Sequence, residues 1–385
     1  MSAFVMPSAS KEEMSNTVEC RECGFRAHSL YGHIGEAHDM TPDEYQAKHE
    51  GAKLLSELGK KVFEANMKKS GPHVSYKPKG YDSMSVFGVG FGKDGDDAKP
   101  IPGYEGFTRD DGVPAADPYY VFPSDVSRDV LLGIATGAKI YAKGPTGSGK
   151  TSLFEQIAAR LGRPFWRQQF HQEMEPVELL GTWTVGENNE MVYLYSGLAE
   201  ALRVPSIICL DEFDSGNPGV TAIANALLEG KPLVLTNKGG EKIYPHDGCV
   251  IVATGNTNGM GDETGLYTST AQQSYATMNR FNMTVVVDYM KAETELEILK
   301  RMFGERKLPE QFMRDIVKVA NMIRDGFIGN KITVPISTRQ VIAWANWLLM
   351  SGNARRSFNL AFANQLGQVD RGVVEEIYQR VFGKD

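Results

Sequence analysis

The sequence predicts an α/β fold with a mainly parallel sheet, followed by a small all-α domain and preceded by a small module rich in metal-ligand residue types. Three observations predict this arrangement. Short apolar runs alternate with helical stretches over 119–290, a pattern typical of strands joined by crossover helices. Over 291–385 only helical periodicity continues. Cysteine and histidine residues with metal-ligand spacing cluster within 1–70.

Length, charge and hydropathy limit the class of protein. A chain of 385 residues can form two or three compact units, each with its own core. The net charge of −7 argues against a protein that coats nucleic acid, which needs a basic surplus. No apolar run approaches the roughly 18 residues that cross a bilayer, and the first residues lack the features of a secretory signal. We therefore expect a cytoplasmic protein without a membrane segment.

The first module, 1–70, contains the pattern C-x2-C-x9-H-x4-H, formed by Cys20, Cys23, His33 and His38. Two thiolates and two imidazoles suit a closed tetrahedral Zn²⁺ site, which would stabilise a segment too small for a large core. The pattern is similar to the bacterial Ros/MucR-type zinc finger. The alternative is a helix with two free thiols. Nine Lys and Arg against eleven Asp and Glu in this module favour docking to a protein over binding to DNA.

The remaining segments are defined by composition and periodicity. Proline, glycine and aspartate are frequent over 71–118, so we expect a linker there with a few anchored residues. A helix is expected to open at Ser124 or Asp125 and to run to Gly137. Strands are expected within 139–144, 164–170, 206–212, 248–256 and 282–289, with helices over 151–162 and 217–230. Further helices are expected over 293–303, 309–327, 338–350 and 354–366.

A phosphate-binding loop is the strongest motif in the sequence. GPTGSGKT matches G-x-x-x-x-G-K-[ST] in full and lies between an expected strand and an expected helix. Glycines let the backbone curl so that N–H groups point at phosphates, and the helix adds its positive end. The alternative is a chance glycine-rich turn. We therefore predict that ATP is bound by Gly144, Pro145, Thr146, Gly147, Ser148, Gly149, Lys150, Thr151 and Ser152.

Two acids at the end of a buried strand predict the metal and the base of a hydrolytic site. SIICLDEFD delivers Asp211 and Glu212 to the carboxyl edge of the sheet, where ligands bind in such folds. Asp211, with the Thr151 hydroxyl, is expected to hold Mg²⁺, and Glu212 to orient and deprotonate the attacking water. Asp214 is expected to be a solvated or helix-capping acid, and Cys209 an inert core residue.

Three polar residues further along the chain are candidates for the same site. Asn256 ends the apolar run 248–256, so its amide could position the hydrolytic water. Arg280 lies at the end of an expected helix and Arg339 at the start of another. Isolated arginines are usually surface charges, so their position alone assigns them no role.

The order of GPTGSGKT, CLDEFD, VATGNTNGMGDETGLYTSTAQQ, MNRF and STRQ resembles the MoxR branch of AAA+ ATPases. The likeness is clearest to the small ATPase subunit of aerobic cobaltochelatase, CobS, and covers roughly 84–385. It implies an AAA+ P-loop core with an all-α lid. It also implies that Asn256 is the sensor 1 residue, Arg280 the arginine finger and Arg339 the sensor 2 arginine. The stretch 177–202 is similar to the helix 2 insert that engages targets in MoxR-type rings.

The resemblance implies an oligomeric ring, most simply a hexamer, that hydrolyses ATP to remodel a partner complex. By analogy the partners would be a von Willebrand A-type protein and a large chelatase subunit that inserts Co²⁺ into a corrin ring in cobalamin biosynthesis. The first 80 residues have no counterpart in the cobaltochelatase subunit. A MoxR-type chaperone for another complex therefore remains an alternative, as do a nucleotide-switched zinc-finger DNA-binding protein and a scaffold without turnover.

Overall fold

A computed structural model describes residues 17–27, 30–38, 40, 42–49, 51–57, 76–91, 97–186, 189–262, 267, 270–306 and 308–383. The chain divides into two compact units, Met1–Ser75 and Tyr76–Asp385, and each is described by itself. Among the described residues, no helix is both long enough and apolar enough to cross a membrane.

In its described residues, the first unit contains two short strands and two helices. Its elements are β1 (Val18–Glu19), β2 (Arg26–Ala27), α2 (Tyr31–His38) and α3 (Pro42–Lys48). β1 and β2 pair antiparallel. A buried cluster joins the elements, and it consists of Cys20, Leu30, Ile34, Tyr45, Ala52 and Leu54. So few apolar side chains form a marginal core by themselves, and modules of this size usually need a further constraint.

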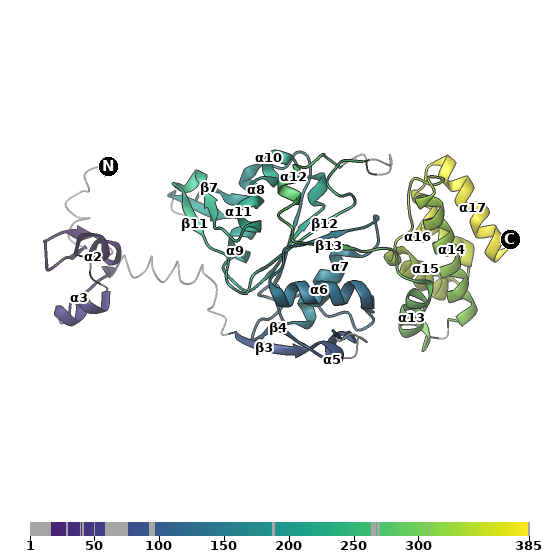
Figure 1. Ribbon diagram of the computed structural model, residues 1–385, viewed down its shortest axis with the longest axis horizontal. Coiled ribbons are helices and arrows are strands. Elements are labelled where there is room, and N and C mark those ends of the chain that lie inside the picture. Colours follow the sequence, from purple (N-terminus) through teal and green to yellow (C-terminus); the bar gives the residue numbers. More distant parts are fainter. Residues whose placement is uncertain are drawn as a thin grey trace. The chain divides into compact units, whose positions relative to one another are not determined.

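A five-stranded parallel sheet forms the centre of the second unit (Figure 1). Each of the five apolar runs forms one of its strands, as predicted. In spatial order the strands are β13 (Met283–Val286), β5 (Ile140–Lys143), β12 (Val250–Gly255), β9 (Ile207–Asp211) and β6 (Phe165–Gln169). All neighbouring pairs are parallel. Their carboxyl ends therefore share one edge, and the predicted polar residues of 211–212 and 256 meet there.

Two insertions were not predicted as hairpins. The first consists of α8 (Pro176–Leu180), β7 (Gly181–Val185), β8 (Met191–Tyr195) and α9 (Gly197–Ala201), and the second pairs β10 (Leu233–Leu235) with β11 (Glu241–Ile243). The single helix expected over 217–230 is instead α10 (Pro218–Thr221) and α11 (Ala224–Leu228). The prediction was wrong there because the intervening amides of Ile223 and Asn225 bond three residues back, which breaks the α-helical ladder.

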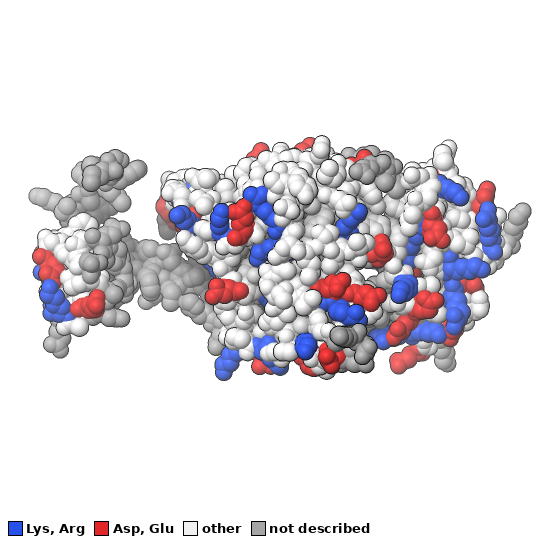
Figure 2. All heavy atoms as spheres, viewed as in Figure 1, with Lys and Arg blue, Asp and Glu red and all other residues white. Residues whose placement is uncertain are grey.

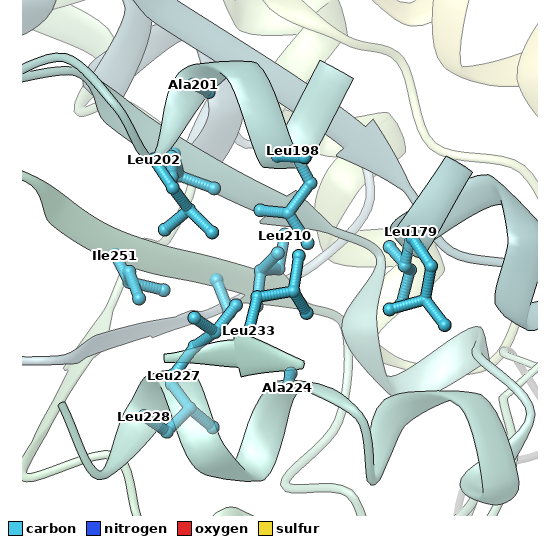
Figure 3. Packing of buried hydrophobic residues seen from close by; sticks show 14 of the residues in the cluster. Leu179, Leu198, Ala201, Leu202, Leu210, Ala224, Leu227, Leu228, Leu233 and Ile251 are labelled. Atoms are coloured by element: carbon cyan, nitrogen blue, oxygen red, sulfur yellow. The ribbon is translucent and has the colours of Figure 1, made fainter. Parts of the chain in front are cut away.

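Apolar side chains cover both faces of the sheet. On one face α6 (Ser124–Thr136) and α7 (Lys150–Arg160) pack on the strands through a cluster that includes Val130, Phe154 and Val252. On the other face, Figure 3 shows Leu210 and Ile251 of the sheet among leucines of α9 and α11. Because successive strand residues alternate between faces, both layers draw on the same strands.

The prediction of a linker over 71–118 is wrong for the described part of that range. β3 (Lys77–Asp82) and β4 (Pro100–Glu105) form an antiparallel pair, and α5 (Ser83–Phe87) follows β3. Phe87 and Ile101 are buried in the same cluster as α6. Composition misled the prediction because the few apolar residues lie on one side of the hairpin, where α6 and α7 cover them.

The described residues of the all-α region after the sheet form five α-helices with a common core. They are α13 (Ala292–Phe303), α14 (Glu310–Ile328), α15 (Thr338–Ser351), α16 (Ala354–Ala361) and α17 (Gln368–Phe382). In its centre Phe358 stacks on Tyr378, and the tilted ring of Trp344 packs against Phe358. Glu295 and Arg324 form a fully buried ion pair at 2.8 Å. A buried guanidinium and carboxylate of this kind make breaking the pair costly, so α13 and α14 are held together.

Candidate functional site

The phosphate loop connects β5 to α7 and adopts a conformation that requires glycine. Gly147 and Gly149 have φ angles of 79° and 90°, a region that residues with a Cβ rarely adopt. A Cβ on Gly144 would collide with the backbone carbonyl of Val287. Gly149 is the N-cap of α7, so the loop's N–H groups and the helix end can face an anion together. This arrangement fits the phosphates of a nucleotide.

The Lys150 ammonium group is held at the centre of the site. Its Nζ donates to the carbonyls of Gly144 and Pro145 at 2.7 and 2.9 Å, and to Asn256 Oδ1 at 2.9 Å. Burial lowers its pKa to about 8, although the carboxylates of Asp214, Asp211 and Glu212 act in the opposite direction. Burial of a charged amine favours its neutral form, and phosphate oxygens would restore the charged one. Asn256, a candidate for this site in the sequence, therefore lies beside Lys150.

Asp211 ends β9 and gathers oxygen donors that suit Mg²⁺. The hydroxyls of Thr151 and Thr254 each donate to Asp211 Oδ1 at 2.6 Å. A carboxylate beside a hydroxyl matches the hard oxygen ligands of Mg²⁺, which retains waters and phosphate oxygens for its other positions. Arg167 Nε donates to the other oxygen, Oδ2, at 2.7 Å. The sequence analysis missed Arg167, because it meets Asp211 only through the pairing of β6 beside β9.

Glu212 has an unusual backbone conformation that directs its side chain. Its φ of 52° lies in the left-handed region, which costs a non-glycine residue about 1–3 kcal/mol. Its amide donates to Thr254 Oγ1 at 3.0 Å, and Gln169 Nε2 donates to its carboxylate at 3.0 Å. Gln169 ends β6 at the same sheet edge. The sequence analysis missed Gln169, whose position at a strand end could have indicated it.

The expectation that Asp214 is a solvated or helix-capping acid is wrong. It lies in the 3-10 turn η1 (Phe213–Ser215) and is fully buried. Its Oδ2 accepts hydrogen bonds from the amides of Asn256 and Thr257, at 2.9 and 2.7 Å, and from the Thr257 hydroxyl at 2.8 Å. Asp214 therefore supports the loop that carries Asn256. Cys209, by contrast, is fully buried in β9 and burial raises its pKa, as expected of an inert thiol.

The helical region completes a cavity of about 550 Å³ over this edge of the sheet. Ser337 and Gln340 form a capping box that begins α15, which places Arg339 in its first turn. The phosphate loop and the helical region are in close contact here, because a Cβ on Gly147 would lie 3.0 Å from Ser337 Cβ. The predicted residues among the described lining are Thr146, Gly147, Gly149, Lys150, Thr151, Ser152, Asp211, Glu212, Asn256 and Arg339.

An adjoining cavity of about 310 Å³ shares the loop and Arg339 with the first. Its walls include Tyr119 and Tyr120 before α6, and Ile298 and Ile342 from the helical region. An aromatic and aliphatic pocket beside a phosphate site suits a nucleotide base. Ser148 lines this cavity, whereas Gly144 and Pro145 line a third, of about 400 Å³, behind the loop. The base-side residues were missed because nothing in the local sequence marks them.

Comparison with known proteins identifies the family. The family described as AAA domain (dynein-related subfamily) matches residues 141–281, and CbbQ/NirQ/NorQ C-terminal matches residues 295–380. The chain is similar to "Aerobic cobaltochelatase subunit CobS" from Sinorhizobium sp., at 30% identity over 74% of this chain and 86% of that relative. The chain belongs to the AAA+ ATPases of the CbbQ/NirQ/NorQ branch. It is an ATPase, and its substrates are ATP with Mg²⁺.

Two further likenesses accompany this assignment. The ATPase is 27% identical to "Protein NorQ" from Paracoccus denitrificans over 69% of its own length and 94% of that relative. A solved structure of a putative ATPase from Cytophaga hutchinsonii matches with a TM-score of 0.35 and 19% identity, over 71% of this chain and 92% of that one.

Arg280 lies outside the described lining of the ATPase's own cavity. It follows α12 (Tyr275–Met278), and its Nε contacts a carboxylate oxygen of Glu229 at 2.7 Å. A second guanidinium nitrogen donates to the carbonyl of Ala276. The side chain is 28% exposed, so it is held by local partners at the surface. One chain alone therefore does not bring Arg280 to the phosphate loop.

The four predicted zinc ligands of the ATPase's first unit lie together. One ligand atom from each of Cys20, Cys23, His33 and His38 falls within 4.8 Å of the others. Cys20 Sγ is 3.4 Å from His38 Nε2, and Cys23 Sγ is 3.2 Å from His33 Nε2. Burial raises the Cys20 pKa, but hydrogen bonds from the backbone and from Tyr45 outweigh it and lower the pKa to about 6. The donor set suits Zn²⁺.

The depressed pKa of Lys150 predicts that nucleotide affinity falls at high pH. Below about pH 8 the amine is already charged in the free protein, so affinity should be constant. Above that pH, binding must take up a proton, and affinity should fall by about tenfold per pH unit. Titration of ADP calorimetrically from pH 7 to 9.5, in buffers of different ionisation enthalpy, measures both effects. Lys150→Arg is the control, because its guanidinium stays charged. A flat profile for the wild type would contradict the prediction.

Proposed function

We propose that this ATPase forms a hexameric ring that hydrolyses ATP at its subunit boundaries and uses the energy to remodel a partner complex. One observation carries the proposal. A single chain assembles around one cavity the phosphate loop, Asp211, Glu212, Asn256 and Arg339, whereas Arg280 lies outside the described lining. We infer that a neighbouring subunit supplies Arg280 to the γ-phosphate, since arginine fingers act on γ-phosphates in this way.

Each residue has a separate role in the proposed hydrolysis. Lys150 holds the phosphates, and Thr151 and Asp211 hold Mg²⁺, which neutralises phosphate charge when bound. Glu212 accepts the proton of the attacking water. Asn256, fixed by its bond to Lys150, orients that water.

Arg167 has to exchange partners in this scheme. Its guanidinium contacts Asp211 through two nitrogens, so Mg²⁺ binding would require this cation to move away. Arg339, at the start of α15, would then report nucleotide to the helical lid.

The inserted hairpins are the proposed surface for the remodelled target. Trp183, Val185, Met191 and Leu194 of β7 and β8 are between 46% and 62% exposed, and clusters of exposed apolar side chains mark interaction sites. The relative CobS is named as a cobaltochelatase subunit. By analogy, we propose a chelatase-like complex with a von Willebrand A-type partner, with cobalt as cargo.

A MoxR-type chaperone that serves a different complex is the second candidate. One observation favours it. The family matches begin at residue 141, so the cysteine–histidine unit lies outside them, and an added unit of this kind suits a motor that serves a different complex. A DNA-binding role has less support. Figure 2 shows Lys and Arg interspersed with Asp and Glu over the visible face of the second unit, without a continuous basic face in that view.

A substrate trap tests the proposed function. Glu212→Gln should keep ATP bound without hydrolysis, so partners that bind the ATP state should accumulate on it. The matched control is Lys150→Ala/Glu212→Gln, whose ATP affinity should be about tenfold to a hundredfold lower, used at an ATP concentration that leaves it mostly unbound. Recovery of a von Willebrand A-type protein on the trap alone would support the chelatase-like motor, and recovery of another complex would support the chaperone. Recovery of DNA, or of the same proteins on both variants, would count against ATP-dependent remodelling.

We further propose that the first unit binds one zinc ion through Cys20, Cys23, His33 and His38, and that hydrolysis does not need it. The two units are separately compact, so loss of the metal should unfold only the first. Metal analysis should find zinc in the wild type and none in Cys20→Ser/Cys23→Ser, with equal ATPase rates. Cys249→Ser, in the second unit, should retain zinc. A zinc content in the double variant equal to that of the wild type would contradict the proposed zinc site.

A further inference from the structure

Gln273 is a buried amide that joins three segments of the ATPase core. Its side chain is 3% exposed. Its Nε2 donates to the carbonyl of Gly216 at 2.7 Å, and its Oε1 accepts from the Thr221 hydroxyl at 2.9 Å. Its own amide donates to the carbonyl of Gly259 at 2.7 Å. A buried polar side chain satisfied at both ends specifies one arrangement of its neighbours, because any displacement leaves polar atoms without partners.

The same network includes the groups that support the hydrolytic site. Gly216 follows the turn that contains Asp214, and Gln273 Nε2 also lies 3.4 Å from the Asp214 carbonyl. The amide of Ala271 donates to that carbonyl at 2.8 Å. On the sensor side, the amide of Gly259 donates to Thr257 Oγ1 at 3.1 Å, and Thr257 is bound by Asp214. Gln273 therefore lies where the loop after Glu212 meets the loop after Asn256.

Helix α12 begins at Tyr275, two residues after Gln273, and leads to Arg280. A helix of four residues has no stability of its own, because nucleation is unfavourable at that length. Its N-cap, Ser274, makes no capping bond through its side chain. Thr277 and Phe281 are buried and anchor the far end. At the near end, Gln273 provides the side-chain bonds that attach the helix to the catalytic loops.

We propose that Gln273 is a positioning residue for Arg280. By tying the start of α12 to the turn that follows Glu212, it sets the direction in which the arginine leaves the surface towards a neighbouring subunit. The finger of one subunit is thereby coupled to the arrangement of that subunit's own Glu212 and Asn256 loops. This inference rests on the proposed action of Arg280 across the subunit boundary, and it goes further by naming what aims the residue.

Hydrogen exchange of the full-length protein tests whether Gln273 attaches α12 to the core, and this test does not depend on the ring. Gln273→Met keeps the shape and removes the polar ends, and Thr221→Val removes the donor to Gln273 Oε1. Thr221→Val should speed exchange of the amides of 277–280 by about fivefold to tenfold, as expected for loss of one buried hydrogen bond. Gln273→Met, which removes both side-chain bonds, should speed it by at least as much. Gln272→Met is the matched control, because the neighbouring glutamine is exposed. Unchanged exchange in Gln273→Met and Thr221→Val would overturn the proposal.

Mixed rings separate aiming of the finger from a general loss of structure. Lys150→Ala chains supply the finger and Arg280→Ala chains supply the phosphate loop. Gln273→Met on the Lys150→Ala chain should lower the recovered ATPase rate by about tenfold or more, since small misplacements of a catalytic group are costly. On the Arg280→Ala chain it should lower the rate much less. Equal losses on both chains would overturn the aiming role. If the parent mixture recovers no activity, it is the action of Arg280 across subunits that fails.

Discussion

Replacing Glu212 with glutamine is expected to lower the ATP turnover number by about 10²- to 10⁴-fold, the usual contribution of a positioned general base, while leaving ATP bound. Glutamine keeps the shape of the side chain but cannot accept the proton of the attacking water. The phosphate loop, Lys150 and the Asp211 metal site are unchanged by the substitution. The strained backbone at residue 212 should persist, because the hydrogen bond from its backbone N–H to Thr254 Oγ1 does not depend on the side chain.

Lys150→Ala, unlike Glu212→Gln, should act mainly on ATP binding. It removes a buried charge that faces the phosphates, so ATP affinity should fall by about tenfold to a hundredfold, as for lost charge-assisted hydrogen bonds. Calorimetric titration with ATP and phosphate release, measured on the same preparations, distinguish the two variants. Glu297→Gln, an exposed change on α13, is the control and should behave as wild type. Normal turnover by Glu212→Gln would exclude it as the base.

The second large effect is expected from Arg280. Arg280→Ala should lower the turnover number by about 10³- to 10⁵-fold, as for arginine fingers in other nucleotide hydrolases, with ATP binding retained. In one chain its guanidinium pairs with Glu229 and the Ala276 carbonyl. A surface ion pair of this kind contributes about 0–1 kcal/mol, so exchanging Glu229 for a neighbour's γ-phosphate costs little. Loss of that pair alone would not explain a thousandfold loss of rate.

Mixing two inactive variants tests whether Arg280 acts across the boundary. In random rings of Arg280→Ala and Lys150→Ala chains, about a quarter of the interfaces join an intact loop to an intact finger, as follows from cyclic symmetry. Activity should therefore return on mixing. Arg301→Ala, an exposed change on α13, should neither lose activity nor alter the mixture. Mixed rings that form by light scattering but stay inactive would contradict action in trans, and full activity of a monomer would end the ring model.

The sequence alone determined the elements whose signals are local. The glycines, lysine and threonine of 144–151 belong to one loop and the first turn of the helix after it, so their spacing predicts the phosphate site. The apolar runs ending in Asp211 and Glu212 and in Asn256 indicate buried parallel strands, and parallel strands share one edge. The periodicity of 293–303, 309–327, 338–350 and 354–366 predicted the helical region, because each helix buries one face.

Only the tertiary structure decided the contacts between distant segments. Arg167 meets Asp211 and Gln169 meets Glu212 because β6 is paired beside β9, which no local pattern reveals. The same holds for the burial of Phe87 and Ile101 in one cluster with α6. Asp214 looked like a surface acid, yet the loop of Asn256 and Thr257 folds over it and supplies three donors to its Oδ2. A polar side chain is buried when distant segments satisfy it, and sequence spacing does not record where those segments will lie.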